Sequence, residues 1–126
     1  MEKRVLVVDD DPPVLELVRE VLTGAGFSVS TVADGPACLR KVIEETPDLI
    51  VLDVNMPDMD GFTVLRKLRE RPATKELPVI LLTVREEHGD VLQGWLAGAN
   101  LYMSKPCSPT ELVAAVQQML EAPARI

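Results

Sequence analysis

Aromatic residues are scarce in this sequence, at 3% of 126 residues, and basic residues are outnumbered by acidic ones. There are 13 Lys and Arg against 20 Asp and Glu, so the formal net charge is −7. Nucleic-acid binding relies on positive charge that attracts phosphates and on aromatic rings that stack with bases. We therefore expect no direct nucleic-acid binding by this chain.

Cysteines and long apolar runs are also few. The two cysteines, Cys38 and Cys107, have no CxxC or metal-binding spacing, so we expect reduced thiols rather than a disulfide. No apolar run approaches the roughly 20 residues that span a bilayer, and no signal peptide follows Met1. These absences favour a cytoplasmic protein with no membrane association.

Short apolar runs alternate with longer amphipathic segments along the chain. Continuous runs predict strands buried on both faces, and alternating runs predict edge strands. Five segments are expected to be strands: 5–8, 27–32, 49–52, 79–82 and 101–104. Five are expected to be helices: 12–25, 36–45, 61–70, 86–97 and 110–121.

This alternation predicts an α/β fold, a single doubly wound domain at 1–122 followed by a short C-terminal tail at 123–126. Its five-stranded parallel sheet would carry helices on both faces through right-handed crossovers. The two alternating runs belong at the edges, so the expected strand order is 2-1-3-4-5, which is flavodoxin-like.

Polar residues follow four of the five predicted strands. Ligands of such folds bind at the carboxyl ends of the strands where the strand order reverses, here between the first and third. Asp9, Asp10 and Asp53 should meet there. Two carboxylates about 5 Å apart repel by roughly 3 kcal/mol at an effective dielectric near 20. Such a cluster favours a hard cation, and Mg²⁺ suits it because it binds a few carboxylates and keeps several waters.

Each of these polar residues also has a simpler interpretation. Asp11, directly before two prolines, is expected to be a helix N-cap. Thr83 is a candidate cap for the next helix, and Lys105 a candidate solvated lysine. The single histidine, His88, is expected to be a solvated helix residue rather than a phosphodonor.

Taken together, the three carboxylates, Thr83 and Lys105 support phosphoryl transfer to a carboxylate. A carboxylate can form an acyl phosphate by in-line attack when the charge on the transferring oxygens is neutralised. The metal would bind one such oxygen, Lys105 a second and the hydroxyl of Thr83 a third.

The chain resembles the receiver domain of bacterial two-component response regulators over essentially its whole length. The matching segments are VLVVDDDP at 5–12, LIVLDVNMPDMDG at 49–61, PVILLT at 78–83 and AGANLYMSKP at 97–106. The resemblance implies that Asp53 accepts a phosphoryl group from a sensor histidine kinase or a histidine phosphotransfer protein. The chain would then be a CheY-like signalling switch and not an enzyme that turns over an external substrate.

The resemblance also implies the metal ligands. Asp10 and Asp53 would bind Mg²⁺ directly, together with the backbone carbonyl of Asn55, and Asp9 would act through a coordinated water. Lys105 would precede a cis peptide bond to Pro106.

By the same resemblance, Thr83 and Tyr102 form a switch pair that responds to phosphorylation. The output surface would contain Val91, Trp95 and Tyr102, on the face of the fourth helix, fifth strand and fifth helix, with burial of Trp95 in the core as the alternative. This face would serve for effector binding or homodimerisation.

The sequence departs from the common pattern of the family at three places. Val84 stands where a small residue is usual, Cys107 replaces a frequent phenylalanine, and Asn100 with Leu101 stands where acidic residues are common. None of these changes removes a functional group, but Val84 is expected to crowd the phosphoryl pocket and alter its kinetics.

Three other functions fit these residues less well. A haloacid-dehalogenase-like phosphatase would need an aspartate two residues after the nucleophile, where Asn55 stands. A flavin-binding electron carrier would need a first loop rich in Ser, Thr and Gly, and three aspartates there would repel a phosphate. A degenerate receiver that acts only as a scaffold is disfavoured by the complete acidic site. The sequence fits a stand-alone regulator and a fragment of a longer protein equally well.

Overall fold

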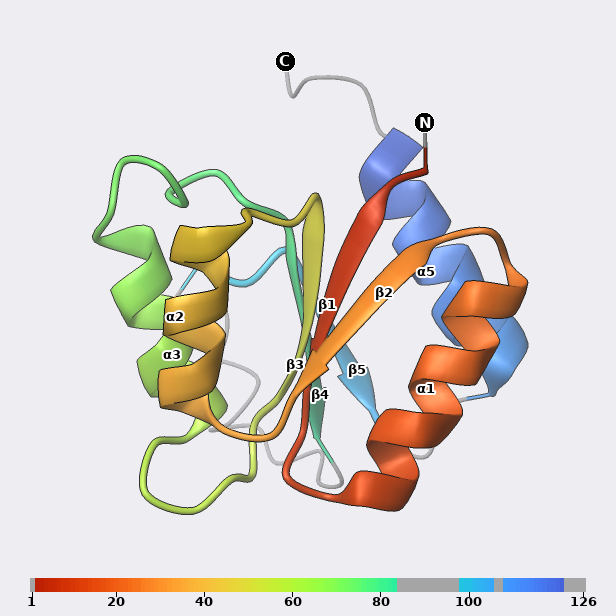
Figure 1. Cartoon of the computed structure of the whole chain (residues 1–126), viewed down its shortest axis with the longest axis horizontal. Helices are drawn as coiled ribbons and strands as arrows, with labels where there is room; N and C mark the ends of the chain where they lie inside the picture. The colour runs from red at the N-terminus through yellow and green to blue at the C-terminus, as the bar shows by residue number, and fades with distance from the viewer. Residues whose placement is uncertain (1, 84–97, 106–107, 122–126) are drawn as a thin grey trace.

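Five parallel strands form the centre of the molecule in the order β2-β1-β3-β4-β5 (Figure 1). The computed structural model describes residues 2–83, 98–105 and 108–121. The strands are β1 (Arg4–Val8), β2 (Ser28–Val32), β3 (Leu49–Asp53), β4 (Val79–Thr83) and β5 (Leu101–Ser104). The helices are α1 (Pro12–Gly24), α2 (Gly35–Glu44), α3 (Gly61–Arg69) and α5 (Pro109–Glu121). The predicted strand order and the doubly wound α/β fold are confirmed.

Some predicted features lie outside the described residues. These are the helix at 86–97, which carries Val91 and Trp95, the positions of Val84, Pro106 and Cys107, and the tail at 123–126. No helix of the described residues is long and apolar enough to cross a membrane.

Helices cover both faces of the sheet, α1 and α5 on one side and α2 and α3 on the other (Figure 1). Successive strand residues point to opposite faces, so each strand contributes to two separate cores. In β1, Leu6 and Val8 pack against the α2 and α3 side, while Val5 and Val7 pack against α1 and α5. This explains why the central strands are continuously apolar.

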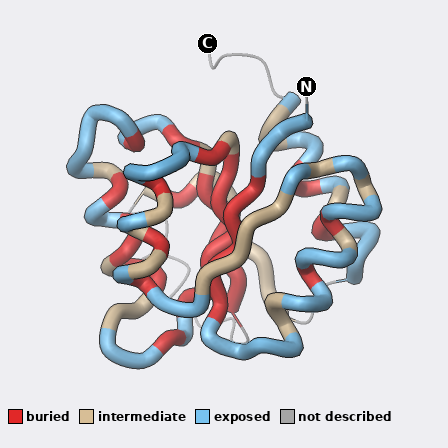
Figure 2. The backbone as a smooth tube through the Cα atoms, in the orientation of Figure 1, coloured by how far each residue is buried: buried red, intermediate tan, exposed pale blue. Residues whose placement is uncertain are grey.

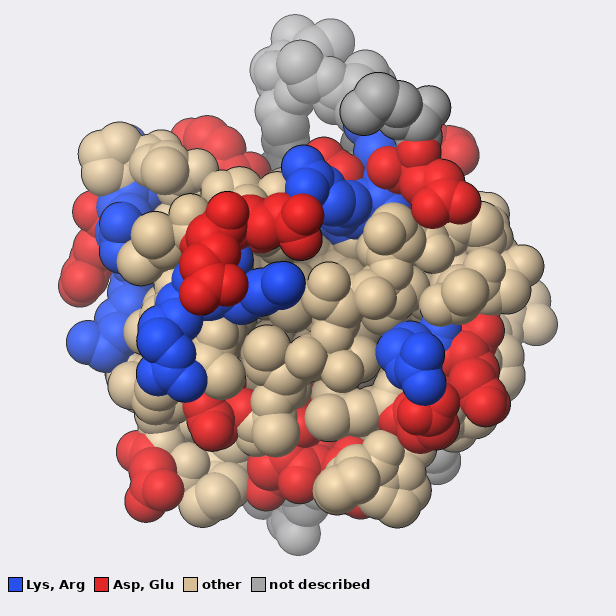
Figure 3. Space-filling view, in the orientation of Figure 1, with Lys and Arg blue, Asp and Glu red and all other residues tan. Residues whose placement is uncertain are grey.

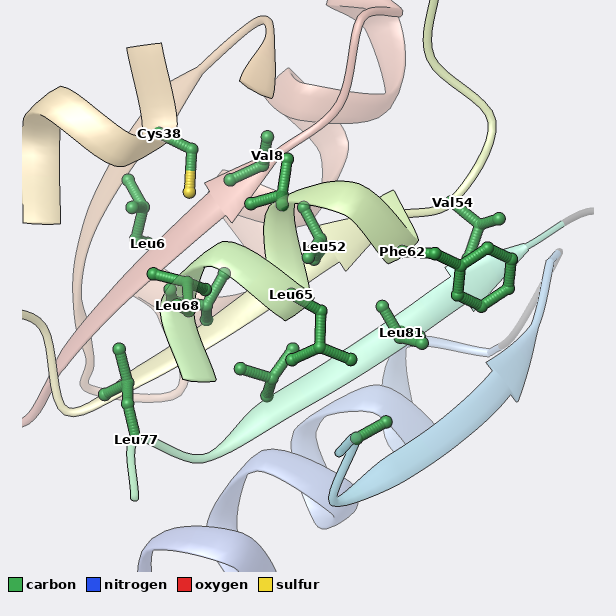
Figure 4. Packing of buried hydrophobic residues seen from close by; sticks show 14 of the residues in the cluster. Leu6, Val8, Cys38, Leu52, Val54, Phe62, Leu65, Leu68, Leu77 and Leu81 are labelled. Atoms are coloured by element: carbon green, nitrogen blue, oxygen red, sulfur yellow. The ribbon is translucent and has the colours of Figure 1, made fainter. Parts of the chain in front are cut away.

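The core on the α2 and α3 side is built mainly from aliphatic side chains (Figure 4). Leu65 and Leu68 of α3 are fully buried between the helix and the sheet, and Cys38 of α2 lies among them. Burial raises the pKa of the Cys38 thiol to about 12. Cys38 is therefore a protonated, free thiol that fills space in the core.

The edge strands differ from the central ones as predicted. Residues of β3 and β4 are buried throughout, whereas those of β5 and most of β2 are only partly buried. Figure 2 shows this contrast along the backbone, with the buried segments at the centre of the sheet. The interior strands β1 and β3 are thereby fixed in place, and the candidate site lies at their ends.

Asp11 corrects one prediction. It occupies the N-cap position of α1, but its side chain makes no capping hydrogen bond. Its backbone amide instead donates to Asp9 Oδ1 at 3.0 Å. The predicted capping role is therefore wrong, and α1 begins with prolines that have no amide to be capped at its first positions.

Other helices have side-chain caps. Asp34 Oδ1 accepts from the amide of Ala37 at 2.7 Å at the start of α2. At α5, Ser108 Oγ accepts from the amide of Glu111 at 3.0 Å, and the Ser108 amide donates to Glu111 Oε1 at 3.3 Å. This reciprocal pair is a capping box, and it fixes where α5 begins after β5.

Candidate functional site

The structure brings three carboxylates together at the carboxyl edge of the sheet. Asp9 directly follows β1 and Asp53 ends β3, and these two strands are neighbours. Each of Asp9, Asp10 and Asp53 offers an oxygen within 4.8 Å of the others. Asp9 and Asp53 are buried, at 2% and 3% exposure, whereas Asp10 is exposed. Acidic side chains also gather along this lower edge of the molecular surface in Figure 3.

Lys105 reaches into this cluster from the end of β5. Its Nζ lies 2.6 Å from Asp9 Oδ2 and 3.1 Å from Asp53 Oδ1. The backbone amide of Lys105 donates to the carbonyl of Thr83. The pairing of β4 with β5 therefore fixes the position of the Lys105 backbone. One ammonium thus contacts the two buried carboxylates.

The pKa values of the buried pair reflect this arrangement. Burial and the charge of Asp9 raise the pKa of Asp53, and contact with Lys105 only partly opposes them. Burial lowers the pKa of Lys105, but its hydrogen bond to Asp9 and the charge of Asp53 outweigh burial, so the net shift is upward. Lys105 is therefore a cation at neutral pH. The ionised form of Asp53 is disfavoured by burial and by repulsion from Asp9.

The cluster has the composition of a hard-cation site. Three carboxylates face one ammonium, so two negative charges stay uncompensated by Lys105. Oxygen ligands at this spacing match what a small divalent cation binds. The residues present therefore fit a metal, and Asp10 is the member of the cluster that solvent reaches most freely.

Gly61 holds the following loop against the site. Its amide donates to the carbonyl of Val54 at 3.0 Å. A Cβ at this position would lie 2.5 Å from the carbonyl oxygen of Asp53, which is closer than side chains tolerate. The first residue of α3 is thus packed directly onto the backbone of the candidate phosphoacceptor.

Thr83 lies at the end of β4, fully buried. Its hydroxyl donates to Asn55 Oδ1 at 2.9 Å, and the Asn55 amide lies 3.4 Å from Asp53 Oδ1. The sequence predicts a role for the backbone carbonyl of Asn55 but not this contact of its side chain. A signal was present, because Asn55 follows β3 by two residues and Thr83 ends the neighbouring strand.

Tyr102 is half-buried in β5 and packs against the α2 and α3 core. It pairs with Leu81, and Thr83 is two residues further along β4. Paired residues and residues two apart share a sheet face, so Thr83 and Tyr102 lie on the same face. Val91 and Trp95, the other residues of the expected output surface, lie outside the described residues.

Asn100, one of the departures from the family pattern, belongs to a network at the opposite edge of the sheet. Its Oδ1 accepts from Arg69 and from the amide of Val79, both at 2.9 Å. Arg69 also donates to the carbonyls of Gly98 and Thr74, at 3.0 and 3.1 Å. The network joins the end of α3 to the starts of β4 and β5, and no pattern in the sequence predicts it.

Comparison with known proteins agrees with this geometry. Residues 5–117 match the family described as the response regulator receiver domain. The chain is 43% identical to the response regulator PleD of Caulobacter vibrioides over 119 residues, which is 94% of this chain and 26% of PleD. It is 42% identical to the DNA-binding response regulator MtrA of Mycolicibacterium smegmatis over 95% of this chain and 51% of MtrA. The chain therefore spans about a quarter and a half of these relatives.

Solved structures share the fold closely. A response regulator from Chloroflexus aurantiacus, 38% identical, superposes with a TM-score of 0.91 over 95% of this chain and 98% of that one. The receiver domain of the sensor histidine kinase PA1611 from Pseudomonas aeruginosa, 29% identical, gives 0.90 over 97% and 100%. That structure holds a magnesium ion in its active site cleft.

The fold and the acidic edge of the sheet define a signalling domain of the CheY-like type. This chain belongs to the response regulator receiver domain family of two-component systems. Membership supports a role in phosphorylation-dependent signalling.

Proposed function

We propose that Asp53 accepts a phosphoryl group from a phosphohistidine of a sensor histidine kinase or a histidine phosphotransfer protein. The observation that carries the proposal is the setting of Asp53. It is a buried carboxylate with the Lys105 ammonium 3.1 Å away and two further carboxylates close by. In the reaction an oxygen of Asp53 would attack phosphorus, the phosphorus–nitrogen bond would break, and the released histidine nitrogen would keep the bonding electron pair.

Lys105 and Thr83 would stabilise the charge on the phosphoryl oxygens. Lys105 already contacts the attacking carboxylate, so it needs no long movement to contact a group bound there. Asp9 would orient this lysine through their 2.6 Å contact. Thr83 is the last residue of β4 and lies at the same edge of the sheet. Its hydroxyl would donate to a second oxygen of the phosphoryl group.

The proposed cofactor is Mg²⁺. Asp10, Asp53 and the carbonyl of Asn55 would hold the ion, with Asp9 acting through a coordinated water. When bound, the ion supplies positive charge that stabilises the transferring phosphoryl oxygens. Asp9 suits an indirect role because its two oxygens already accept from the amide of Asp11 and from Lys105.

The proposed response runs through Thr83 and Tyr102, which share a sheet face. Movement of Thr83 toward a phosphoryl group would vacate space on this face, and Tyr102 would turn inward. The face formed by the fourth helix, β5 and α5 would then present Val91, Trp95 and Tyr102 to an effector or a second copy. The chain spans only part of PleD and MtrA. Any output beyond this domain is therefore also a proposal.

Intact-mass analysis tests the phosphoacceptor directly. The protein is incubated with a small phosphodonor such as acetyl phosphate and Mg²⁺, and we expect the mass of one phosphoryl group to be added. Asp53→Asn should abolish the addition. Asp58→Asn is a matched control, because Asp58 is an exposed residue of the same loop with φ 69°, a conformation that Asn adopts readily. Equal labelling of the Asp53→Asn protein would remove Asp53 from this role.

A further inference from the structure

The side chain of Asn55 makes a contact that the proposed chemistry does not use. Its Oδ1 accepts the hydroxyl proton of Thr83 at 2.9 Å. Thr83 is completely buried, whereas Asn55 is exposed in the loop between β3 and α3. The Thr83 hydroxyl thus donates its proton to a neutral acceptor at the boundary between protein and solvent.

This contact competes with the proposed role of Thr83. A hydroxyl has one proton to donate. If Thr83 donates to a phosphoryl oxygen on Asp53, it no longer donates to Asn55. The two hydrogen bonds therefore exclude each other, and one belongs to the unphosphorylated state and the other to the phosphorylated state.

We propose that the side chain of Asn55 stabilises the unphosphorylated state by holding the hydroxyl of Thr83. This proposal rests on the proposed function, since it names a regulator of the same site. The backbone around Asn55 is fixed independently of the side chain. The amide of Val54 donates to the carbonyl of Leu82 at 2.9 Å, and that of Met56 to the carbonyl of Val54 at 3.2 Å. These bonds hold the main chain of Asn55 beside the end of β4, within reach of the Thr83 hydroxyl.

The consequence is a threshold for switching. A phosphoryl oxygen on Asp53 has to displace Asn55 as the acceptor of the Thr83 hydroxyl. It succeeds because a charged acceptor forms a stronger hydrogen bond than a neutral amide. Removing the Asn55 side chain removes the competitor, so phosphoryl mimics should bind more tightly. A neutral hydrogen bond contributes enough to change an affinity by about 2- to 12-fold.

A double-mutant cycle on the full chain measures this coupling. The affinity for beryllofluoride at saturating Mg²⁺ is determined by calorimetry for the wild type, Asn55→Ala, Thr83→Val and the double variant. In the wild-type background, the affinity of Asn55→Ala is divided by that of the wild type, and in the Thr83→Val background the affinity of the double variant is divided by that of Thr83→Val. We expect the first ratio to be about 3- to 10-fold larger than the second. Equal effects in the two backgrounds, or a less favourable effect when Thr83 is present, would overturn the proposal. Direct contacts between Asn55 and beryllofluoride cancel in this comparison.

A second measurement needs no ligand. In EDTA, the urea midpoint of unfolding is compared for the same four proteins. We expect Asn55→Ala to lower the midpoint more in the wild-type background than in the Thr83→Val background, because only Thr83 can donate to Asn55. Equal decreases in the two backgrounds would overturn the proposal. If the wild type fails to bind beryllofluoride, the proposed function fails, and the unfolding comparison still decides the role of Asn55.

Discussion

Neutralising Asp53 should stabilise the metal-free, unphosphorylated protein. Asp9 offers an oxygen within 4.8 Å of an oxygen of Asp53, so this pair repels by about 3.5 kcal/mol at an effective dielectric of 20. Lys105 Nζ at 3.1 Å attracts Asp53 by about 5 kcal/mol at the same dielectric. The burial of Asp53, which is the largest cause of its raised pKa, acts together with the charge of Asp9 and outweighs this attraction. The exposed Asp10 is screened by solvent and adds little.

We therefore expect Asp53→Asn to raise the free energy of unfolding by about 1–2 kcal/mol at neutral pH in EDTA. Urea unfolding followed by far-UV circular dichroism measures this value. The pKa of Asp53 is raised in the fold, by burial first and by Asp9 second. The native state then holds this proton more tightly than the unfolded state, so stability is lost as the pH rises through the native pKa. The advantage of Asp53→Asn should accordingly shrink as the pH is lowered below that pKa.

Two controls separate this effect from a general loss of negative charge. Asp58→Asn removes a charge from the same loop outside the cluster and should change stability by less than about 0.5 kcal/mol. If Asp53 is a ligand of Mg²⁺, as proposed, the ion should bind the wild type more tightly than Asp53→Asn, so saturating Mg²⁺ should narrow the difference in stability between them. If Asp53→Asn is less stable than the wild type in EDTA, pairing with Lys105 outweighs the repulsion and the reasoning fails.

The remaining predictions concern the supports of the site. Arg69→Met removes three hydrogen bonds of a half-buried guanidinium and should destabilise the fold by about 2–3 kcal/mol in urea unfolding. Arg66→Met, on an exposed position of the same helix, is its control, and equal effects would contradict a specific role for the network. Gly61→Ala places a Cβ 2.5 Å from the carbonyl of Asp53 and should cost more than about 2 kcal/mol. Gly24→Ala, with nothing within 4 Å, should be neutral or stabilising, and a tolerated Gly61→Ala would show that α3 moves freely.

The sheet and the acidic cluster were predictable because each is encoded locally. The apolar runs and the polar residues that end them can be found without knowing any contact. Asp9 and Asp53 are far apart in sequence, yet the topology of a parallel sheet brings strand ends together. The strand order likewise followed from the alternating patterns of the two edge strands.

The contacts that the sequence did not indicate depend on the direction in which individual side chains point. Asp11 has the residue type and position of an N-cap, but its amide donates to Asp9 Oδ1 and its own side chain makes no cap. Arg69 and Asn100 are 31 residues apart, and no periodicity links them. The contact between Asn55 and Thr83 depends on the register of β3 and β4, which places the side-chain amide after β3 level with the hydroxyl at the end of β4. The sequence alone does not give the directions of these two side chains.

The loop between β3 and α3 is closed at its base. The amide of Gly61 bonds to the carbonyl of Val54 at 3.0 Å, so the chain leaves the sheet after Asp53 and returns to the same place. Its tip, at Pro57 and Asp58, is exposed. Lengthening a loop whose ends are already joined costs little, because closure entropy grows only slowly with length. The tip is thus a natural place for evolution, or for an engineer, to add a recognition sequence or a reporter peptide while the geometry around Asp53 stays fixed.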